Sequence, residues 1–307
     1  MMNYNKQVLV SISCITYNHA QFIRRCLDSF LMQKTNFAFE VLIHDDCSTD
    51  GTTEIIKEYE AKYPNIIKPI YENENQYAQG KPIGSDVWNY PRAQGKYIAF
   101  CEGDDYWTDM FKLQKQVDFL ENNQDYSMCF HRAKIVGDLS VKTDLDISKI
   151  GNRDYSGQEL FDNWIVPTAS ILARTEYVLQ KVKDKQLVVN GDIIIVLSCA
   201  SKGKIRGFAD VMSAYRIHAG GITYSSEQRK GRIMRMPEHF VCIKENFSFL
   251  EKEKIDARIA FCYWRRAKIQ ILLINKIADI LNACKYSPVT CLKLFIKDLF
   301  CLSYYNI

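Results

Sequence analysis

The chain has 307 residues, of which 47% are hydrophobic and 25% are charged. This balance excludes disorder, collagen and a coiled coil as overall descriptions, and it predicts a globular protein with a substantial core. The net charge of +4 is too small for a dedicated nucleic-acid binder, so no nucleic-acid partner is expected. The length suggests about two domains.

The sequence predicts no membrane-spanning segment. Its polar start does not resemble a signal peptide, and no apolar run reaches the roughly 18 residues that a spanning helix needs. The eleven cysteines include no C-x-x-C pair, and most of them lie in apolar stretches. This pattern indicates reduced thiols in a cytoplasmic protein rather than disulfides or a zinc site.

The first part of the chain alternates short β-branched runs with amphipathic segments. Strands are expected at 8–16, 39–44, 66–71 and 96–101, and helices at 20–33, 52–63, 86–93 and 109–122. This alternation predicts an α/β fold with a doubly wound, mostly parallel sheet, in which ligands bind at the carboxyl ends of the strands. Neither G-x-G-x-x-G after the first strand nor a P-loop motif occurs, which argues against a dinucleotide fold and a P-loop ATPase.

The second part continues with fewer clear elements. Strands are expected at 126–136 and 168–173, and a strand or a hairpin at 204–217. A helix is expected at 189–201, a loop at 137–155, and helices from 225 onward with a break at Pro288. We therefore expect a catalytic domain over residues 1–225, with halves at about 1–125 and 126–225, and a helical region over 226–307.

Acidic residues follow two of the predicted strands. Asp45 and Asp46 end one strand, and adjacent buried carboxylates are costly unless they bind something. Ser48 and Asp50 suit a turn and a helix cap, but this explanation leaves Asp46, which we interpret as a ligand contact.

The second acidic group is the segment Glu102-Gly103-Asp104-Asp105. Gly103 permits a tight turn, so the three carboxylates can converge on a hard divalent cation. The alternative is an acidic loop that caps the helix near Asp109.

Three further positions suit catalysis. Asp192 is a candidate general base or an ordinary N-cap of the following helix. Arg216 and His218 suit a diphosphate, although a lone histidine is usually structural. Three residues are candidates on the acceptor side, with core packing as the alternative for the two tryptophans: Trp107, Trp164 and Thr168.

These motifs, in this order, resemble family 2 glycosyltransferases, which have a GT-A fold. The resemblance rests on Thr16-Tyr17-Asn18, the segment 45–52 and the segment 102–105, and it covers about residues 8–225. The stretch from Asp192 to His218 is similar to the second half of bacterial members that build surface polysaccharides. The resemblance implies a single Rossmann-like, mostly parallel mixed sheet flanked by helices, with a C-terminal helical extension.

The resemblance also implies roles for individual residues. Thr16, Tyr17 and Asp46 would hold the nucleotide base of a donor, with Asn18 and Asp45 beside them. Asp104 and Asp105 would contact the ribose and a Mg²⁺ or Mn²⁺ ion on the diphosphate. Asp192 would be the base of an inverting reaction, and Arg216 and His218 would close over the diphosphate, with His218 near the metal. Members often carry Asp-Ser-Asp-Asp where this chain has Glu102-Gly103-Asp104-Asp105, so which of these acids contact the metal stays open.

The resemblance thus implies an inverting, metal-dependent enzyme that moves a sugar from a nucleotide-sugar donor, expected to be UDP-linked, to a hydroxyl of a glycan or lipid-linked acceptor. The chemistry agrees, because the leaving diphosphate needs a cation and the acceptor hydroxyl needs a base. A sugar nucleotidyltransferase and a catalytically inactive nucleotide-sugar-binding scaffold are the alternatives.

The positive charge lies at the C-terminal end, where residues 251–307 contain ten Lys and Arg but five Asp and Glu. Basic and apolar residues alternate along 255–305, a pattern typical of helices that lie on a membrane surface. It is equally typical of helices that pack on a domain with their charges in solvent. The membrane interpretation would place the protein on the inner face of the cell membrane.

Overall fold

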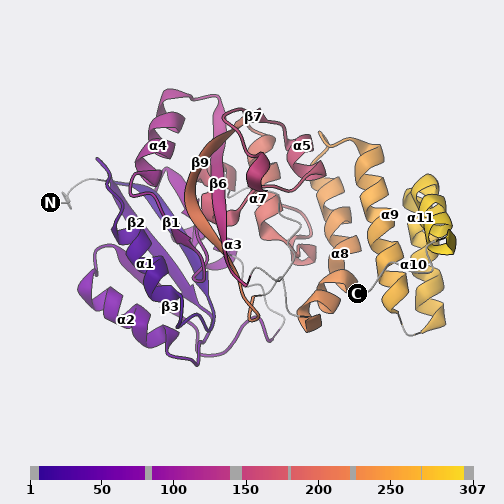
Figure 1. Cartoon of the computed structure of the whole chain (residues 1–307), viewed down its shortest axis with the longest axis horizontal. Helices are drawn as coiled ribbons and strands as arrows, with labels where there is room; N and C mark the ends of the chain where they lie inside the picture. Colours follow the sequence, from indigo (N-terminus) through magenta and orange to yellow (C-terminus); the bar gives the residue numbers. More distant parts are fainter. Residues whose placement is uncertain are drawn as a thin grey trace. The chain divides into compact units, whose positions relative to one another are not determined.

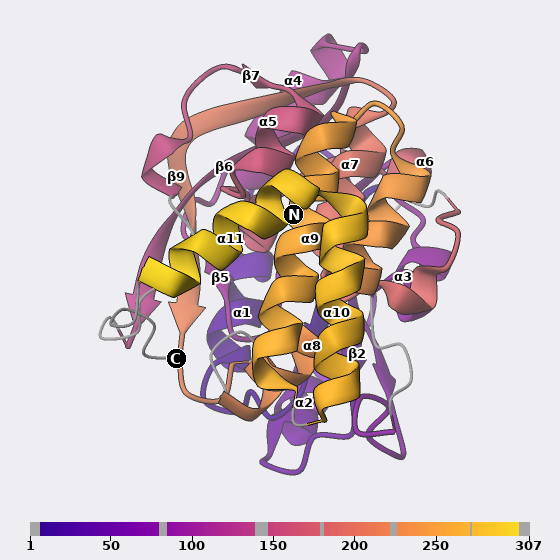
Figure 2. The same ribbon diagram turned by 90° about the vertical axis from the view of Figure 1, so that its right-hand side faces the viewer.

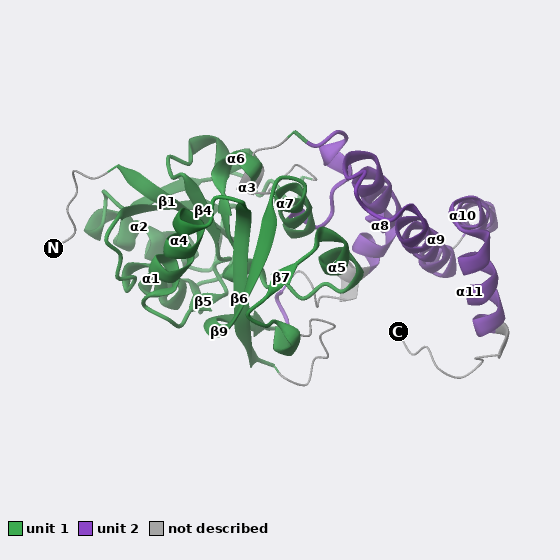
Figure 3. Cartoon of the chain, turned by 90° about the horizontal axis from the view of Figure 1, so that it is seen from above, with its two compact units in different colours: residues 1–181, 192–218 green, residues 182–191, 219–307 purple. Residues whose placement is uncertain are grey.

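The structure is a computed structural model, and it describes residues 7–79, 85–138, 147–178, 181–221, 226–270 and 272–300. Contacts divide the chain into two compact units (Figure 3). Unit 1 contains residues 1–181 and 192–218, and unit 2 contains residues 182–191 and 219–307. The boundary falls after His218, near the division expected at residue 225, and the segment 182–191 joins the helical unit.

Unit 1 contains one mixed sheet with helices on it (Figure 1). Within the described residues its order is β3-β2-β1-β4-β8-β6-β9-β5, and β7 pairs with β9. The strands are β1 (Val8–Thr16), β2 (Ala38–Asp45), β3 (Ile67–Tyr71), β4 (Tyr97–Phe100), β5 (Tyr106–Trp107), β6 (Tyr126–Gly137), β7 (Asp154–Tyr155), β8 (Leu172–Arg174) and β9 (Lys204–Ile217). The helices are α1 (Ile23–Leu31), α2 (Thr52–Lys62), α3 (Ser85–Trp88), α4 (Lys112–Asn122), α5 (Gly157–Asp162), α6 (Thr175–Val178) and α7 (Gly191–Ala200).

The directions of the strands decide where their carboxyl ends lie. β1, β2, β3 and β4 are parallel, β8 runs antiparallel to both β4 and β6, and β9 is parallel to β6. Because β8 is antiparallel to both β4 and β6, β6 runs in the same direction as β4, and so does β9. The carboxyl end of β9 therefore lies at the same edge as those of β1, β2 and β4. In such a sheet this edge is the expected ligand site.

Both faces of the sheet are buried. Along β4, Tyr97 and Ala99 belong to one apolar cluster with residues of α1, α2 and α4, whereas Ile98 and Phe100 belong to a second cluster with residues of α5 and α7. This alternation follows from the two-residue period of a strand. A strand that is covered on both faces reads as a continuous apolar run, as β1 and β4 do in the sequence.

The predicted fold class is confirmed, and the local differences are small. The strand expected at 168–173 begins as a 3₁₀ turn at Thr168–Ser170, and only Leu172–Arg174 forms a strand. The Ser170 hydroxyl donates to the Pro167 carbonyl at 2.6 Å and so favours the turn. Within the loop expected at 137–155, residues 139–146 lie outside the described residues, and a short strand, β7, forms at its end.

Unit 2 is helical in its described part (Figure 2). It contains the 3₁₀ turn η4 (Lys185–Leu187) and the helices α8 (Ser226–Asn246), α9 (Lys252–Ile269), α10 (Leu273–Tyr286) and α11 (Pro288–Phe300). The predicted break at Pro288 is present, because this proline starts α11. α9 contacts α8, α10 and α11. Among the helices that the structure describes, none combines the length and the apolar character needed to cross a bilayer.

Candidate active site at the carboxyl edge of the sheet

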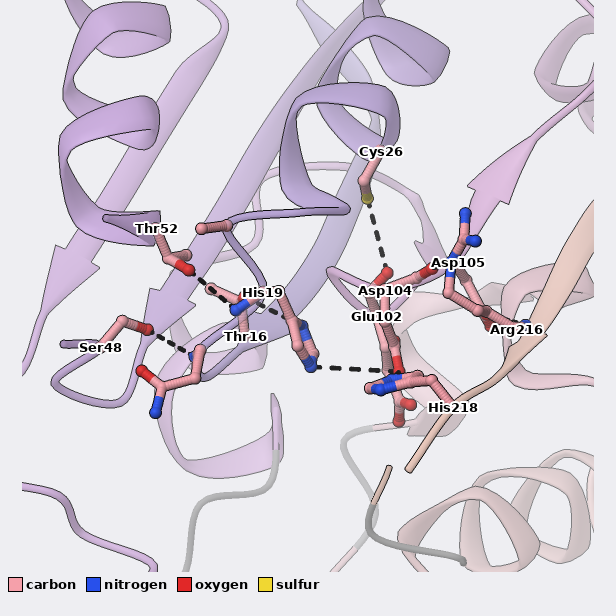
Figure 4. Close-up of polar contacts among 12 residues, drawn as sticks. Thr16, His19, Cys26, Ser48, Thr52, Glu102, Asp104, Asp105, Arg216 and His218 are labelled. Carbon is pink, nitrogen blue, oxygen red and sulfur yellow. Dashed lines mark hydrogen bonds and ion pairs between the residues drawn. The ribbon is translucent and has the colours of Figure 1, made fainter. Parts of the chain in front are cut away.

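Four segments meet at the carboxyl edge of the sheet (Figure 4). Residues 17–19 follow β1, residues 46–51 follow β2, residues 101–105 follow β4, and His218 follows β9. They come from distant parts of the sequence, and the parallel strand directions bring them together.

The first two loops brace each other through hydrogen bonds. Asn18 has a positive φ of 54° and donates its backbone N–H to Ser48 Oγ at 2.9 Å, while its Oδ1 accepts from Thr49 N at 2.8 Å. The His19 backbone N–H donates to Thr52 Oγ1 at 2.8 Å. Asn18, predicted to bind the donor, therefore holds the loop that follows β2.

Asp45 and Asp50 also shape this loop. Asp45 is buried, and its Oδ1 accepts from the Ser48 hydroxyl at 2.5 Å. Asp50 accepts from the backbone N–H groups of Ala20, at 2.9 Å, and Thr52, at 3.0 Å. Ser48 and Asp50 thus shape the turn before α2, as does Asp45, which was expected beside the donor, while the N-cap residue of α2 is Gly51.

Asp46 holds a third loop. Its two carboxylate oxygens accept from the backbone N–H groups of Gln76, at 2.7 Å, and Tyr77, at 3.1 Å. The side chain is 3% exposed. These two hydrogen bonds explain how a buried carboxylate is tolerated at this position. The contact of Asp46 with a nucleotide base stays a prediction.

The loop after β4 brings Asp104 to two histidines. His218 Nε2 lies 3.0 Å from Asp104 Oδ2, and His19 Nε2 lies 4.0 Å from the same oxygen. The Nδ1 atom of His19 lies 3.1 Å from Thr16 Oγ1, which orients the imidazole. A Cβ atom at Gly103 would lie 2.6 Å from Thr16 Oγ1 and 2.9 Å from His19 Nδ1. Glycine at this position therefore allows the acidic loop to approach β1 closely.

His19, Asp104 and His218 offer potential metal-ligand atoms that all lie within 4.8 Å of one another. Among the residues that the structure describes, the second oxygen of Asp104, Oδ1, has no hydrogen-bond partner, and it is buried. A buried polar atom without a partner is costly, and a cation or a ligand would satisfy it. Two imidazoles and a carboxylate suit Mn²⁺ and other transition metals. The residues present therefore fit a divalent metal.

The protonation of this cluster favours a cation. Burial alone would raise the pKa of Asp104, but the hydrogen bond to His218 and the charges of His19 and His218 outweigh it and lower the pKa. Burial lowers the pKa of His19, partly opposed by the charge of Asp104. An ionised carboxylate beside a neutral imidazole is the form that binds metals.

Asp105 points elsewhere. It is 2% exposed, and its Oδ1 accepts the backbone N–H of Arg216 at 2.7 Å. Burial and the neighbouring charge of Asp104 raise the pKa of Asp105 well above its usual value. Asp105 was expected as a metal ligand, but among the described residues the cluster contains His19 in its place. Asp105 anchors the end of β9 instead.

Arg216 is fixed against the acidic loop. Its Nε donates to the Asp104 backbone carbonyl at 2.8 Å, and its guanidinium carbon lies 4.6 Å from the centre of the Phe22 ring. This arrangement holds a positive charge beside the metal-ligand cluster. His218 also packs on Phe22, with ring centres 4.8 Å apart.

The remaining predicted residues lie outside this cluster. Tyr17 is 44% exposed, as a residue that stacks on a ligand requires. Trp107 is 1% exposed and its Nε1 donates to the Ala169 carbonyl at 2.9 Å, so this tryptophan is a core residue that cannot contact an acceptor. Trp164 packs against the second apolar cluster. Thr168 is half-buried in a 3₁₀ turn.

Asp192 lies in the first turn of α7, inside the helix rather than at the N-cap position expected for its alternative role. It is half-buried, and its Oδ1 accepts the backbone N–H of Ile193 at 2.9 Å. A carboxylate in the first helical turn is stabilised by the helix dipole, and this role does not prevent it from acting as a base.

The doubly wound sheet and the site at its carboxyl edge define the fold as that of the GT-A glycosyltransferases. The crystal structure of TarS from Staphylococcus aureus in complex with UDP-GlcNAc is similar, with a TM-score of 0.65, over 94% of this chain and 84% of that chain. The sequence identity is 19%, so this likeness concerns the fold alone.

The sequence comparisons identify the family. The family model described as glycosyl transferase family 2 matches residues 11–180. The chain belongs to glycosyl transferase family 2, which confirms the resemblance noted in the sequence.

Two curated relatives show the extent of the similarity. An uncharacterized protein of Mycobacterium tuberculosis is 35% identical over 219 residues, which cover 71% of this chain and 61% of the relative. WfaP of Escherichia coli, a UDP-Glc:α-D-GlcNAc-diphosphoundecaprenol β-1,3-glucosyltransferase, is 30% identical over 223 residues, which cover 70% of this chain and 80% of WfaP. The chain thus spans less than two thirds of the mycobacterial relative.

Proposed function

We propose that the protein is an inverting, metal-dependent glycosyltransferase that moves a sugar from a nucleotide-sugar donor to a hydroxyl group. The observation that carries this proposal is the cluster of His19, Asp104 and His218 at the carboxyl edge of a GT-A sheet. Such a cluster suits a divalent cation, and a cation suits the diphosphate of a donor.

The donor we propose is UDP-linked. The E. coli relative is named for a UDP-Glc donor, and the TarS structure contains UDP-GlcNAc. The exposed ring of Tyr17 is available to stack on a uracil base, and the Asp46 carboxylate is the candidate acceptor of a base N–H. Arg216 supplies a positive charge for the diphosphate.

The metal we propose is Mg²⁺ or Mn²⁺, held by Asp104 and His218, with His19 as a further ligand, and the two imidazoles favour Mn²⁺ over Mg²⁺. When bound, such an ion acts as a Lewis acid that stabilises the charge of the departing nucleoside diphosphate. Arg216 contributes positive charge from its place against the acidic loop.

Asp192 is the proposed general base. An inverting transfer needs a carboxylate that removes the proton of the acceptor hydroxyl on the face of the sugar opposite the leaving group. Asp192 is the half-buried carboxylate of the first turn of α7. The proposed acceptor is a glycan or a lipid-linked oligosaccharide in surface polysaccharide synthesis, in line with the diphosphoundecaprenol-linked acceptor for which the E. coli relative is named. The corresponding location is the cytoplasm, at the inner face of the cell membrane.

A donor screen tests the activity. The full chain is incubated with UDP-Glc, UDP-GlcNAc and GDP-mannose in the presence of Mn²⁺, and the nucleotide products are analysed. We expect release of a nucleoside diphosphate from one donor. Release of pyrophosphate from a sugar phosphate and a nucleoside triphosphate would instead identify a nucleotidyltransferase. Donor binding without turnover on any acceptor would support an inactive scaffold.

Two variants test the site. We expect Asp192→Asn to lower transfer by about a thousandfold while donor affinity stays unchanged. Loss of donor binding with the fold intact would refute its role as the base. The matched control is Asp210→Asn, because that carboxylate is 54% exposed and lies 3.9 Å from Lys115 rather than in the metal-ligand cluster.

Metal binding is measured without turnover, by electron paramagnetic resonance of Mn²⁺ titrated into the chelator-treated protein. We expect Asp104→Asn and His19→Ala each to weaken Mn²⁺ binding by at least about tenfold, since removal of even a residue that only supports a ligand costs that much. Unchanged Mn²⁺ affinity in both variants would disprove the proposed ligand set, even if the enzyme remained active.

A further inference from the structure

The two last helices of unit 2 carry an apolar surface that faces solvent. We call this surface the outer strip, and it consists of Leu273, Ile274, Ile277 and Leu281 on α10 and Val289, Leu292, Phe295 and Ile296 on α11. The α10 members are 48% to 74% exposed, and the α11 members are 43% to 64% exposed. Isolated exposed apolar residues are ordinary, but eight of them on two consecutive helices that contact each other mark an interaction surface.

The spacing of these residues places them on one side of each helix. On α10 the positions 273, 277 and 281 recur at intervals of four, with Ile274 beside them, and on α11 positions 289, 292 and 296 recur at intervals of three and four. The opposite side of α10 carries Asp279 and Ala283, which are buried. α10 therefore turns its apolar side outward and a carboxylate inward, the reverse of a helix that buries its apolar side in a core.

Ion pairs inside unit 2 explain how this arrangement is tolerated. Arg266 of α9 donates to both oxygens of Asp279, at 2.7 Å to Oδ1 from Nη2 and at 3.0 Å to Oδ2 from Nε. Asp298 of α11 accepts from Trp264 Nε1 at 2.9 Å and from Lys268 Nζ at 2.6 Å. Both acids of α10 and α11 are thus neutralised by α9.

The lysines of the two helices border the outer strip. Lys285 follows Leu281 by one turn, and Lys293 and Lys297 stand next to Leu292 and Ile296. All three lysines are exposed. Because Asp279 and Asp298 are paired with α9, the border of the outer strip is positively charged.

The sequence predicted a candidate membrane surface over residues 255–305, and the burial of α9 shows which part of this range is exposed. Most apolar residues of α9, including Ile255, Ile259 and Trp264, are buried, whereas Phe261 is 40% exposed. Two basic residues of α9 form the ion pairs described above. The surface predicted over residues 255–305 therefore reduces to α10 and α11. A groove of about 570 Å³ lies beside the outer strip, lined by residues of α9, α10 and α11, and Leu292 and Phe295 of the outer strip are among its lining residues.

We propose that the outer strip docks on the anionic surface of a lipid bilayer. Apolar side chains would enter the boundary between head groups and acyl chains, and the bordering lysines would contact anionic head groups. A second copy of the chain fits less well, because a symmetric pair would place the same lysine-bordered surfaces against each other. This proposal does not rest on the donor site, and it is tested without any nucleotide sugar.

The test is sedimentation of the full chain with vesicles, either of phosphatidylcholine alone or of phosphatidylcholine mixed with phosphatidylglycerol. We expect binding to the anionic vesicles and much weaker binding to the neutral ones. The triple variant Ile274→Ser, Ile277→Ser, Leu281→Ser should bind anionic vesicles at least about tenfold more weakly. Each substitution removes apolar surface whose transfer from water into the bilayer favours binding. The double variant Lys285→Gln, Lys293→Gln should lose roughly tenfold, on anionic vesicles only.

Matched controls test whether the loss of any exposed apolar side chain or lysine, outside the outer strip and its border, would weaken vesicle binding in the same way. Val211→Ser removes an apolar side chain that is 49% exposed in unit 1, and Lys202→Gln with Lys252→Gln removes two exposed lysines elsewhere. These variants should bind vesicles like the wild type. Circular dichroism and thermal unfolding check that every variant is folded.

Three results would overturn the proposal. The first is absence of vesicle binding by the wild type. The second is equal binding by the wild type and the folded triple variant. The third is a dimer in sedimentation equilibrium that the triple variant dissociates and that does not bind vesicles, because the outer strip would then be a subunit interface.

Discussion

Lys112 is a buried lysine in the core of unit 1, and its replacement by methionine should stabilise the protein. The side chain has no exposed surface, its Nζ donates to Gln116 Oε1 at 2.8 Å, and it lies 4.1 Å from the centre of the Trp107 ring. Burial lowers the pKa of Lys112 from 10.5 to about 7. Trp107 follows the acidic loop by two residues, so this core region supports the candidate site.

The sign of the effect follows from proton binding. Between pH 7 and 10.5 the unfolded chain holds a proton on Lys112 that the folded chain has largely lost, so stability rises with pH across this window and is lowest at its acidic end. The resulting cost at pH 7 is about 4 kcal/mol. Lys112→Met removes this cost, but it leaves Gln116 Oε1 without this donor, which costs about 1–3 kcal/mol. We expect a net gain of about 1–3 kcal/mol at pH 7.

The assay is urea unfolding of the wild type and Lys112→Met at about pH 7 and about pH 9.5, with Lys57→Met, an exposed lysine in α2, as the control. At the higher pH the cost of Lys112 falls to about 1 kcal/mol, so the advantage of the variant should disappear. A gain that is the same at both pH values would refute the reasoning, because packing alone does not titrate. A lower free energy of unfolding for Lys112→Met than for the wild type at pH 7 would also refute it. Lys112 would then stabilise the protein by more than its contacts with Gln116 and Trp107 provide.

Two further variants test the architecture. Gly103→Ala should displace Thr16 or His19, lower the free energy of unfolding by about 1–3 kcal/mol and weaken Mn²⁺ binding, as thermal unfolding and the Mn²⁺ titration would show. Unchanged Mn²⁺ affinity in this variant would mean that the loop 102–105 shifts without displacing the imidazole of His19. Arg266→Met should destabilise unit 2 by about 3–5 kcal/mol, because it leaves the buried Asp279 without its partner. Calorimetry should then show an earlier transition, and the additional change Asp279→Asn should restore part of the loss.

Much of the fold follows from the order of residues along the chain. The strands at 8–16, 126–136 and 204–217 and the helix at 52–63 match the structure to within a residue, because each has one dominant period and ends at a turn residue. The short strand β5 was not predicted. Its two residues are held by pairing with β9, more than a hundred positions away, and local sequence does not contain that information.

The candidate site was predicted in part, for the same reason. Asp104 and His218 were expected near a metal, and the structure brings them together. His19 was taken as part of the break after the first strand, because nothing in the sequence shows that Thr16 turns its ring toward Asp104. Asp105 was expected beside Asp104, yet successive residues point in different directions, and its carboxylate bonds the backbone of β9 instead.

The structural and functional roles of the acidic residues need not exclude each other. A carboxylate has two oxygens and about four acceptor positions. Asp46 uses one position on each oxygen for the N–H groups of Gln76 and Tyr77. An N–H from a nucleotide base can therefore be added without breaking either bond. The loop bonds would then hold the carboxylate in place before the donor arrives, which lowers the entropic cost of binding. The same residue would thus serve the fold and the proposed donor site, with its structural bonds fixing the geometry that recognition requires.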